Sequence, residues 1–322
     1  MQNYKFYEKL LHELILSNEN LKKSMFLLEK YFISKKIFNW SENKHIFITG
    51  LPRSGSTALL NFFYKTEKFA SLTYKDMPFV LAVNLFKFVN ESKSIEVFKE
   101  RAHKDGIFYS KSSPEAFEEI FWNTFKEKTD THYFVTYLNL ILNKYNKSRY
   151  LSKNNYNYKR IDFIKKKFPN SLLIILFRDP LQTSYSLLKQ HQRFIQLQKK
   201  NNFIKKYMIW LGHTEFGESH KYWFKPNKYK DTKSINYWLE QWLLFYKNLL
   251  ALNLQNYKNL LFLEYEKLSQ LKTMKKLSNK AMINYQHNEN PFVLSVRNEL
   301  KGFNPDLLNE CQKVLKKLKD SK

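Results

Sequence analysis

The chain is poor in glycine and cysteine: its 322 residues include 6 glycines and a single cysteine, Cys311. One cysteine excludes an intramolecular disulfide, a cysteine-rich zinc site and a CxxC redox pair, and it fits a reducing compartment. No stretch approaches the roughly 20 apolar residues that span a bilayer. His12 and Glu13 interrupt the apolar pattern near the N-terminus, unlike a signal peptide. We therefore expect a cytoplasmic protein without a membrane span.

Arginine is also scarce. Seven of the 55 basic residues are arginine and the other 48 are lysine, and the formal net charge is +26. A nucleic-acid interface would show an arginine-rich face or a recognisable module, and neither is visible. Lysine spread through a chain rich in Asn, Tyr, Phe and Ile indicates a genome-wide bias that places lysine on solvated faces. We expect no nucleic-acid partner, and the few arginines and glycines become informative.

A strand–loop–helix unit begins with the β-branched and aromatic run 46–49, which ends at Gly50. Such a loop binds phosphate, because its backbone N–H groups and the helix dipole favour negative charge. Nucleotide hydrolases use Gly, four residues, Gly, Lys, then Ser or Thr. The spacing from Gly50 to Gly55 matches, but Ser56 replaces the lysine and a cation, Arg53, lies inside the loop. This pattern predicts a site for a single phosphate-like or sulfate-like group rather than for ATP.

A second anion site is predicted after the continuous apolar run 172–177, which is typical of a central parallel strand buried on both faces. Arg178 follows at the carboxyl end of this strand, where ligands bind in open α/β sheets. Asp179 is a good N-cap and Pro180 suits the first position of the next helix. Ser186 lies in the second turn of that helix, so Arg178 and Ser186 together would bind a second phosphate.

Strand and helix patterns alternate along the chain, which predicts an α/β protein. We expect a P-loop-like fold of three layers, with a central parallel β-sheet flanked by helices. A single domain is expected, with an N-terminal helical extension at 1–43, a core at 44–268 and a helical C-terminal segment at 269–322. Residues 200–232 are rich in Lys and Asn and are expected to form a long loop.

A further helix is expected to begin at Ser113, which would be its N-cap, with Pro114 at the first helical position. The acids that follow, Glu115, Glu118 and Glu119, then fit as first-turn charges that favour the helix dipole.

The two anion motifs together resemble those of the sulfotransferase superfamily, and the resemblance runs from about residue 44 to residue 265. The loop 50–57 is similar to the family's 5′-phosphosulfate loop, and Arg178 with Ser186 is similar to its 3′-phosphate motif. Phrases at 76–79, 113–119 and 212–217 resemble a mostly bacterial branch. The implied donor is 3′-phosphoadenosine 5′-phosphosulfate. Its implied binding residues are Pro52, Arg53, Ser54, Gly55, Ser56, Thr57, Arg178, Ser186 and Tyr265.

The resemblance also implies catalytic roles. Lys153 matches the family lysine that stabilises the leaving group, and Arg53 would assist it. The general base is either Asp76, 23 residues after Arg53, or His103. A carboxylate can serve as base if burial raises its pKa. No metal is expected, because the lysine and arginine charges would stabilise the transferred group.

The expected reaction is transfer of a sulfuryl group from this donor to a hydroxyl of a small-molecule or glycan acceptor, a carbohydrate or another metabolite. Two alternatives stay open: a P-loop nucleotide kinase, which would need a lysine at position 56, and a non-catalytic nucleotide-binding family member. A homo-oligomer also stays open.

Overall fold

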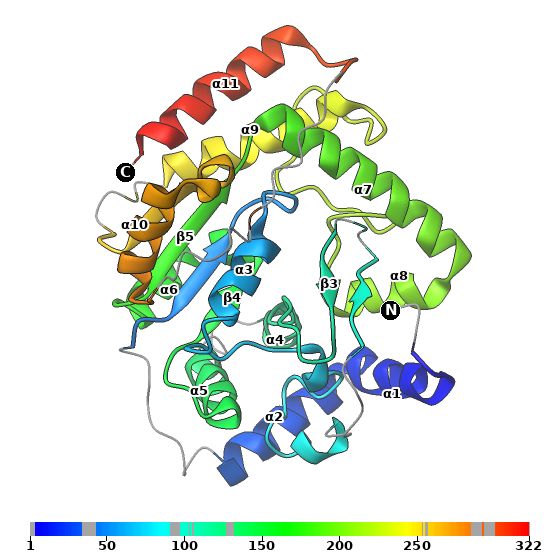
Figure 1. Ribbon diagram of the computed structural model, residues 1–322. Coiled ribbons are helices and arrows are strands. Elements are labelled where there is room, and N and C mark those ends of the chain that lie inside the picture. The colour runs from blue at the N-terminus through cyan, green and yellow to red at the C-terminus, as the bar shows by residue number, and fades with distance from the viewer. Residues whose placement is uncertain are drawn as a thin grey trace.

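A computed structural model describes residues 4–33, 43–90, 97–102, 104, 106–126, 132–252, 254, 257–284, 292 and 300–321. Its centre is a four-stranded sheet in the order β4-β1-β5-β6, in which every neighbouring pair is parallel (Figure 1). The strands are β1 (Ile46–Thr49), β4 (Leu151–Lys153), β5 (Leu172–Phe177) and β6 (Leu260–Glu264). The two predicted central strands are confirmed, whereas β4 is too short for its pattern to predict it.

Helices cover both faces of this sheet. Side chains alternate along a strand, so Ile174 and Leu176 of β5 join one apolar cluster with α3 (Ser56–Tyr64) and α10 (Leu271–Ala281). Leu173 and Ile175 join the other cluster. That cluster includes side chains from α5 (Tyr133–Tyr145), α6 (Ile161–Lys167), α7 (Pro180–Lys200) and α9 (Ile235–Ala251). The predicted three-layer α/β fold with a parallel sheet is therefore confirmed.

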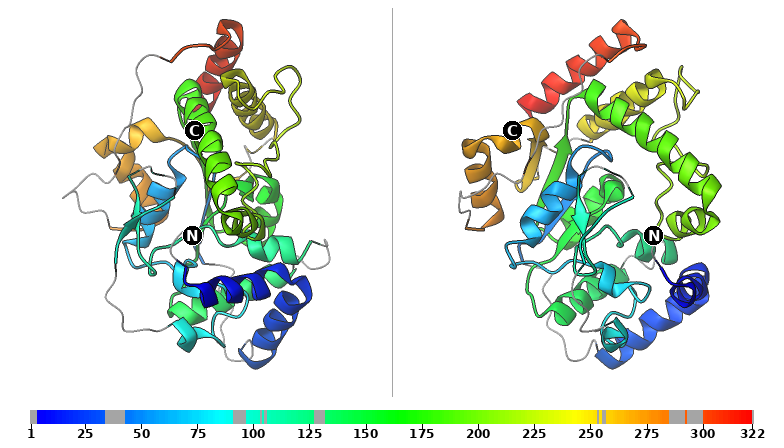
Figure 2. Two further views of the ribbon diagram at one scale, coloured as in Figure 1. Left: turned by 90° about the vertical axis from the view of Figure 1, so that its right-hand side faces the viewer. Right: turned by 45° about the vertical axis from the view of Figure 1, so that its right-hand side comes forward.

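The remaining helices pack around these layers. Helices α1 (Phe6–Ser17) and α2 (Glu19–Ile33) lie at the opposite end of the molecule from α11 (Pro305–Asp320) (Figure 2). A small antiparallel hairpin of β2 (Lys99–Glu100) and β3 (Phe108–Tyr109) lies outside the main sheet. Within the described ranges, no helix has both the length and the apolar character needed to cross a membrane.

Two sequence expectations about local structure are wrong. The expected loop at 200–232 contains helix α8 (Asn202–Trp210), whose buried residues Ile204, Tyr207 and Met208 follow helical spacing. Its abundant lysines masked this pattern because they occupy the solvated face. Ser113 does not cap a helix: its hydroxyl accepts a hydrogen bond from the Ser110 N–H at 2.9 Å, and α4 starts only at Glu119 (Glu119–Thr124).

Candidate active site

The sheet order places the expected loop and Arg178 next to each other. From β1 the chain passes to β4 on one side and then to β5 on the other, so the topology switches between β1 and β5. Ligands bind at such a switch point, beyond the carboxyl ends of the strands. The loop 50–55 leaves β1 there, and Arg178 leaves β5 there.

Two glycines shape the loop. Gly50 has φ +151°, and a Cβ on it would lie 2.3 Å from the Leu176 carbonyl oxygen. Gly55 has φ +93°, and a Cβ on it would lie 2.1 Å from the ring of Tyr265. Any larger residue would collide at both positions. The ring of Tyr265 therefore packs directly on the end of the loop, where α3 begins.

The loop has features that suit an anion. The N–H groups of the first turn of α3 have no acceptor within the helix, and the helix dipole adds partial positive charge there. The Ser54 hydroxyl is buried and has no hydrogen-bond partner among the described residues. Arg53 adopts φ +72°, a left-handed conformation that is costly for a residue with a side chain. An anionic group such as a phosphate or a sulfate fits this set of hydrogen-bond donors.

One hydrogen bond joins the two motifs. Arg53 Nε donates to Ser186 Oγ at 3.0 Å, although the residues are 133 positions apart. Arg178 is also close by: its guanidinium lies 5.5 Å from the centre of the Tyr265 ring, and its Nε lies 3.5 Å from a Glu266 oxygen. The loop, the start of α7 and the end of β6 thus meet in one place.

A pocket with an empty volume of about 870 Å³, which includes its open mouth, extends from the loop. It lies among α3, the β2–β3 hairpin and α8, and Figure 1 shows β3 between these two helices. Lys153 reaches it from the end of β4. The polar residues that line it include Arg53, Ser56, Thr57, Arg101, Glu115, Lys153, Asn155, His213 and Glu215.

Arg101 and Glu115 connect the loop helix to the opposite wall. The Arg101 guanidinium donates to Thr57 Oγ1 at 3.3 Å and lies 3.6 Å from a Glu115 oxygen. Burial raises the pKa of Glu115, but the nearby charges of Lys153 and Arg101 lower it by more. The pKa of Glu115 is therefore lowered overall. Glu115 is therefore an ionised partner for the two cations rather than a strong base.

His213 and Glu215 form a second buried pair in the pocket. His213 Nδ1 lies 3.6 Å from a Glu215 oxygen, and the Asn155 amide donates to the other Glu215 oxygen at 3.3 Å. Burial lowers the pKa of His213, but the Glu215 charge and hydrogen bond raise it more, so its pKa is raised overall. The histidine is thus oriented by a carboxylate, and an imidazole held in this way can act as a general base when it is neutral.

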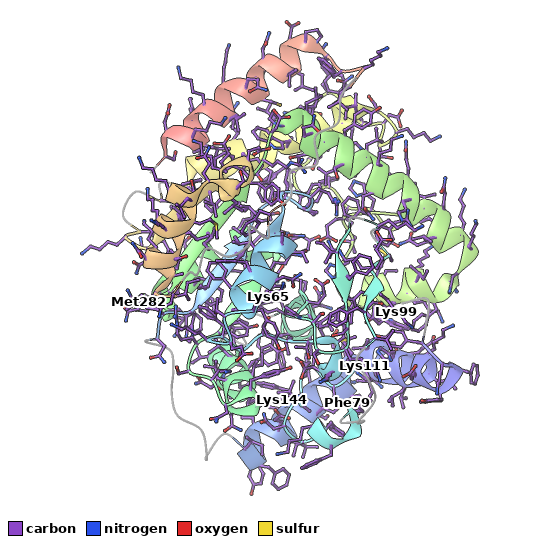
Figure 3. All side chains as sticks on the ribbon, viewed as in Figure 1. Lys65, Phe79, Lys99, Lys111, Lys144 and Met282 are labelled. Carbon is purple, nitrogen blue, oxygen red and sulfur yellow. The ribbon has the colours of Figure 1, made fainter. Side chains whose placement is uncertain are left out.

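Asp76, one of the two expected general bases, does not line this pocket. Its carboxylate accepts from the Thr73 N–H at 2.6 Å, from the Tyr145 hydroxyl at 2.6 Å and from Lys144, and its side chain is fully buried. It is not among the residues that line the pocket. Lys144, labelled in Figure 3, belongs to α5 and appears well below α3 in that view. The other expected base, His103, lies outside the described residues.

Sequence reasoning gave no role to Arg101, expected Glu115 to be a charge in the first turn of a helix, and offered His213 and Glu215 only as residues that could line an acceptor pocket. The phrases at 113–119 and 212–217 contain three of them, so resemblance to the bacterial branch was the only signal. No group of three or more His, Cys, Asp or Glu side chains within the described ranges is placed to hold a metal ion.

Comparison with known proteins gives a family match and distant structural similarity. A model of the sulfotransferase family matches residues 45–277. No curated protein sequence matches the chain significantly.

Three solved structures illustrate the similarity. Sulfotransferase STF9 from Mycobacterium avium has 11% identity and a TM-score of 0.49, with 99% of this chain and 86% of that one covered. Sulfotransferase STF1 from Mycobacterium tuberculosis has 11% identity and a TM-score of 0.48, with coverages of 95% and 79%. The sulfotransferase domain from the curacin biosynthetic pathway has 12% identity and a TM-score of 0.39, with coverages of 86% and 97%.

The family match spans β1, the loop, Lys153, Arg178 and β6. The chain belongs to the sulfotransferase family.

Proposed function

We propose that this protein transfers a sulfuryl group from 3′-phosphoadenosine 5′-phosphosulfate to a hydroxyl of an acceptor in the pocket. The observation that carries the proposal is the Arg53–Ser186 hydrogen bond, which brings the 5′-phosphosulfate loop against the 3′-phosphate motif. A donor with phosphate on both its 3′ and 5′ sides needs two anion sites in this arrangement.

The donor would be held by residues of both motifs. The loop N–H groups with Arg53, Ser54, Ser56 and Thr57 would bind the 5′-phosphosulfate, Pro52 lines the same pocket, and Gly55 sets the shape of the loop. Arg178 and Ser186 would bind the 3′-phosphate. The ring of Tyr265 packs on Gly55 and faces the Arg178 guanidinium, which supports a role for Tyr265 in binding the donor. Such charge-assisted hydrogen bonds are among the strongest that a protein makes to phosphate.

In the reaction, the acceptor oxygen forms a bond to sulfur while the bond from sulfur to the donor's phosphate oxygen breaks. The electron pair of the broken bond stays on that phosphate oxygen, where Lys153 and Arg53 would stabilise the developing charge. The acceptor proton must pass to a base. His213 is the better candidate than Asp76, because His213 lines the pocket and Asp76 is held by Thr73, Lys144 and Tyr145 away from it.

The test uses ³⁵S-labelled donor with fractions of a cell extract as the source of acceptor. We expect labelled product with the natural chain and a rate lowered by roughly 10²-fold or more in Lys153→Ala, as for loss of one group that stabilises transition-state charge. Binding of adenosine 3′,5′-bisphosphate should remain. The control Lys165→Ala removes an exposed lysine of α6 and should leave the rate unchanged. Equal rates in Lys153→Ala and Lys165→Ala would contradict this role.

A further inference from the structure

We propose that helices α1 and α2 form a surface that binds an anionic phospholipid bilayer. This inference is independent of the proposed function, because it concerns the end of the molecule that carries the two N-terminal helices (Figure 2). Exposed apolar side chains concentrate at this end. The four most exposed large apolar side chains among the described residues are 62% to 77% exposed and lie in or beside these helices: Phe6, Tyr7, Tyr31 and Phe88.

Helix α1 has an apolar face on two opposite sides. Its inward face holds the buried residues His12, Ile15 and Leu16. Its outward face holds four large side chains that are each more than half exposed: Phe6, Tyr7, Leu10 and Leu14. Helical spacing puts these four on one side of the helix, away from the inward residues. A helix that only covers a core carries polar side chains outward, so this second apolar face indicates a partner.

Helix α2 continues the same surface. Its residues Met25 and Phe26 are buried, whereas four apolar side chains are 45% to 67% exposed: Leu27, Leu28, Tyr31 and Phe32. Only Asn18 separates α1 from α2, and the two helices follow one another along one rim of the molecule (Figure 1). On the inner side, Ile15 and Met25 share a small apolar cluster with Phe79, which Figure 3 labels. The outward side chains of α1 and α2 are therefore held together, and we call them the docking face.

Lysines accompany the exposed rings at this end. Lys5 Nζ lies 5.9 Å from the centre of the Tyr7 ring, and Lys87 Nζ lies 4.8 Å from the centre of the Phe88 ring. Phe88 follows a segment that Glu29 of α2 holds, since its carboxylate accepts from the Leu85 N–H at 3.2 Å. Helices that lie in a membrane interface combine apolar and aromatic side chains with lysine in this way. The rings enter the head-group region while the long lysine side chains keep their charge at its surface.

The acids of α1 and α2 do not oppose an anionic partner. Each already has a partner within the protein: the Lys5 N–H for Glu8, Lys206 for Glu13, Lys23 for Glu19 and the Asn84 amide for Glu29. The chain as a whole has a formal net charge of +26. A second copy of the chain would bring the same positive excess and be repelled, whereas anionic head groups would be attracted. Charge therefore favours a bilayer over a second copy as the occupant of the docking face.

Co-sedimentation of the full chain with lipid vesicles tests this inference. One set of vesicles contains phosphatidylcholine alone, and the other contains an equal mixture of phosphatidylcholine and phosphatidylglycerol. We expect partitioning to the anionic vesicles to be at least about tenfold stronger, and to weaken as salt is added. The paired change Leu10→Gln and Leu14→Gln removes two outward leucines of α1 but keeps good helix formers. It should weaken partitioning about tenfold or more.

Two further pairs of changes complete the design. Leu28→Gln with Tyr31→Gln tests α2 in the same way and should also weaken partitioning about tenfold. Leu252→Gln with Leu271→Gln replaces two leucines outside the docking face, which are 43% and 39% exposed, and should leave partitioning within about twofold. No binding of the natural chain to anionic vesicles, equal binding to both kinds of vesicle, or unchanged binding in both docking-face pairs would overturn the inference.

Sedimentation velocity without vesicles examines the other occupant. We expect the natural chain and the pair Leu10→Gln and Leu14→Gln to have the same oligomeric state. A dimer of the natural chain that dissociates in this pair would show that the docking face binds a second copy, and it would overturn the inference.

Discussion

Gly55 and Arg53 determine the shape of the loop 50–55, the proposed donor loop, through their backbone conformations. Both have positive φ, and Gly55 in addition leaves no room for a Cβ beneath the Tyr265 ring. A left-handed loop of this kind aims successive N–H groups toward one point, as anion-binding nests do. The glycine content of the chain is low, which is why a retained glycine in this loop carried information in the sequence.

Gly55→Ala should destabilise both the fold and the donor site. The left-handed backbone and the collision with Tyr265 should together lower the free energy of unfolding by about 1–3 kcal/mol. Gly302→Ala is a matched control, because Gly302 also has positive φ, +82°, but its Cβ would meet nothing within 4 Å. Urea unfolding would measure the free energy of unfolding of the two variants and of the natural chain. A loss in Gly55→Ala no larger than in Gly302→Ala would show that contact with Tyr265 is unimportant.

The His213–Glu215 pair makes a prediction about pH. His213 can accept a proton only when neutral, and its pKa is raised above 6.5, so kcat/KM should rise with pH through that raised value. Glu215→Gln removes the charge that raises this pKa, so the acidic limb should move to lower pH. Profiles of kcat/KM against pH for the natural chain and for Glu215→Gln would show this shift of the acidic limb.

The control for this shift is Glu218→Gln, which removes a neighbouring acid that pairs with Lys205 at the surface. Its profile should match that of the natural chain. An acidic limb that stays in place in Glu215→Gln would mean that His213 is not the base.

At the scale of secondary-structure elements, strands and helices with continuous or strongly periodic patterns were predictable. Strand β5 has the bounds that its apolar run predicts, and Asp179 Oδ1 caps α7 by accepting from the Gln182 N–H at 2.8 Å. Elements that are very short, or whose apolar pattern is interrupted by many lysines, were not predictable. Strand β4 has only three residues, and α8 was hidden among lysines. The candidate site follows the same division: two contiguous motifs build its proposed donor side, whereas isolated residues from separate elements line the rest of the pocket.

The contacts of Asp76 predict a structural role for its carboxylate. Its carboxylate ties the turn at 73–76 to Lys144 and Tyr145 at the end of α5. Asp76→Asn should lower the free energy of unfolding by roughly 3 kcal/mol, because it leaves a largely buried lysine without its partner. The control Asp162→Asn, at an exposed position of α6, should change the free energy of unfolding only slightly. Thermal and urea unfolding would compare the two.

Activity at a temperature where Asp76→Asn remains folded separates the two roles. Near-normal kcat in the folded variant is the expected result. A stable variant without turnover would instead return Asp76 to the role of general base.

At the scale of the whole molecule, the parallel sheet and its switch point explain why two distant sequence motifs form one site. The loop after β1 and Arg178 after β5 share an edge because the two strands are neighbours. This arrangement was predictable from the motifs. The wall of the pocket opposite this loop was not predictable, since residues of α8 and of the β2–β3 hairpin, far apart in the sequence, line the same pocket as the start of α3. The net charge of +26 is a property of the surface and does not by itself explain binding of an anionic donor.

The central claim is that the two motifs form one site for a nucleotide phosphorylated at both 3′ and 5′ positions. Calorimetry should therefore compare adenosine 3′,5′-bisphosphate with adenosine 5′-phosphate in the natural chain, in Arg178→Ala and in Lys189→Ala. Lys189→Ala removes one exposed charge from α7 and controls for overall charge.

We predict that the natural chain and Lys189→Ala bind the bisphosphate at least about tenfold more tightly than the monophosphate, and that Arg178→Ala loses this preference. Equal affinity for the two nucleotides in the natural chain, or an unchanged preference in Arg178→Ala, would contradict the account.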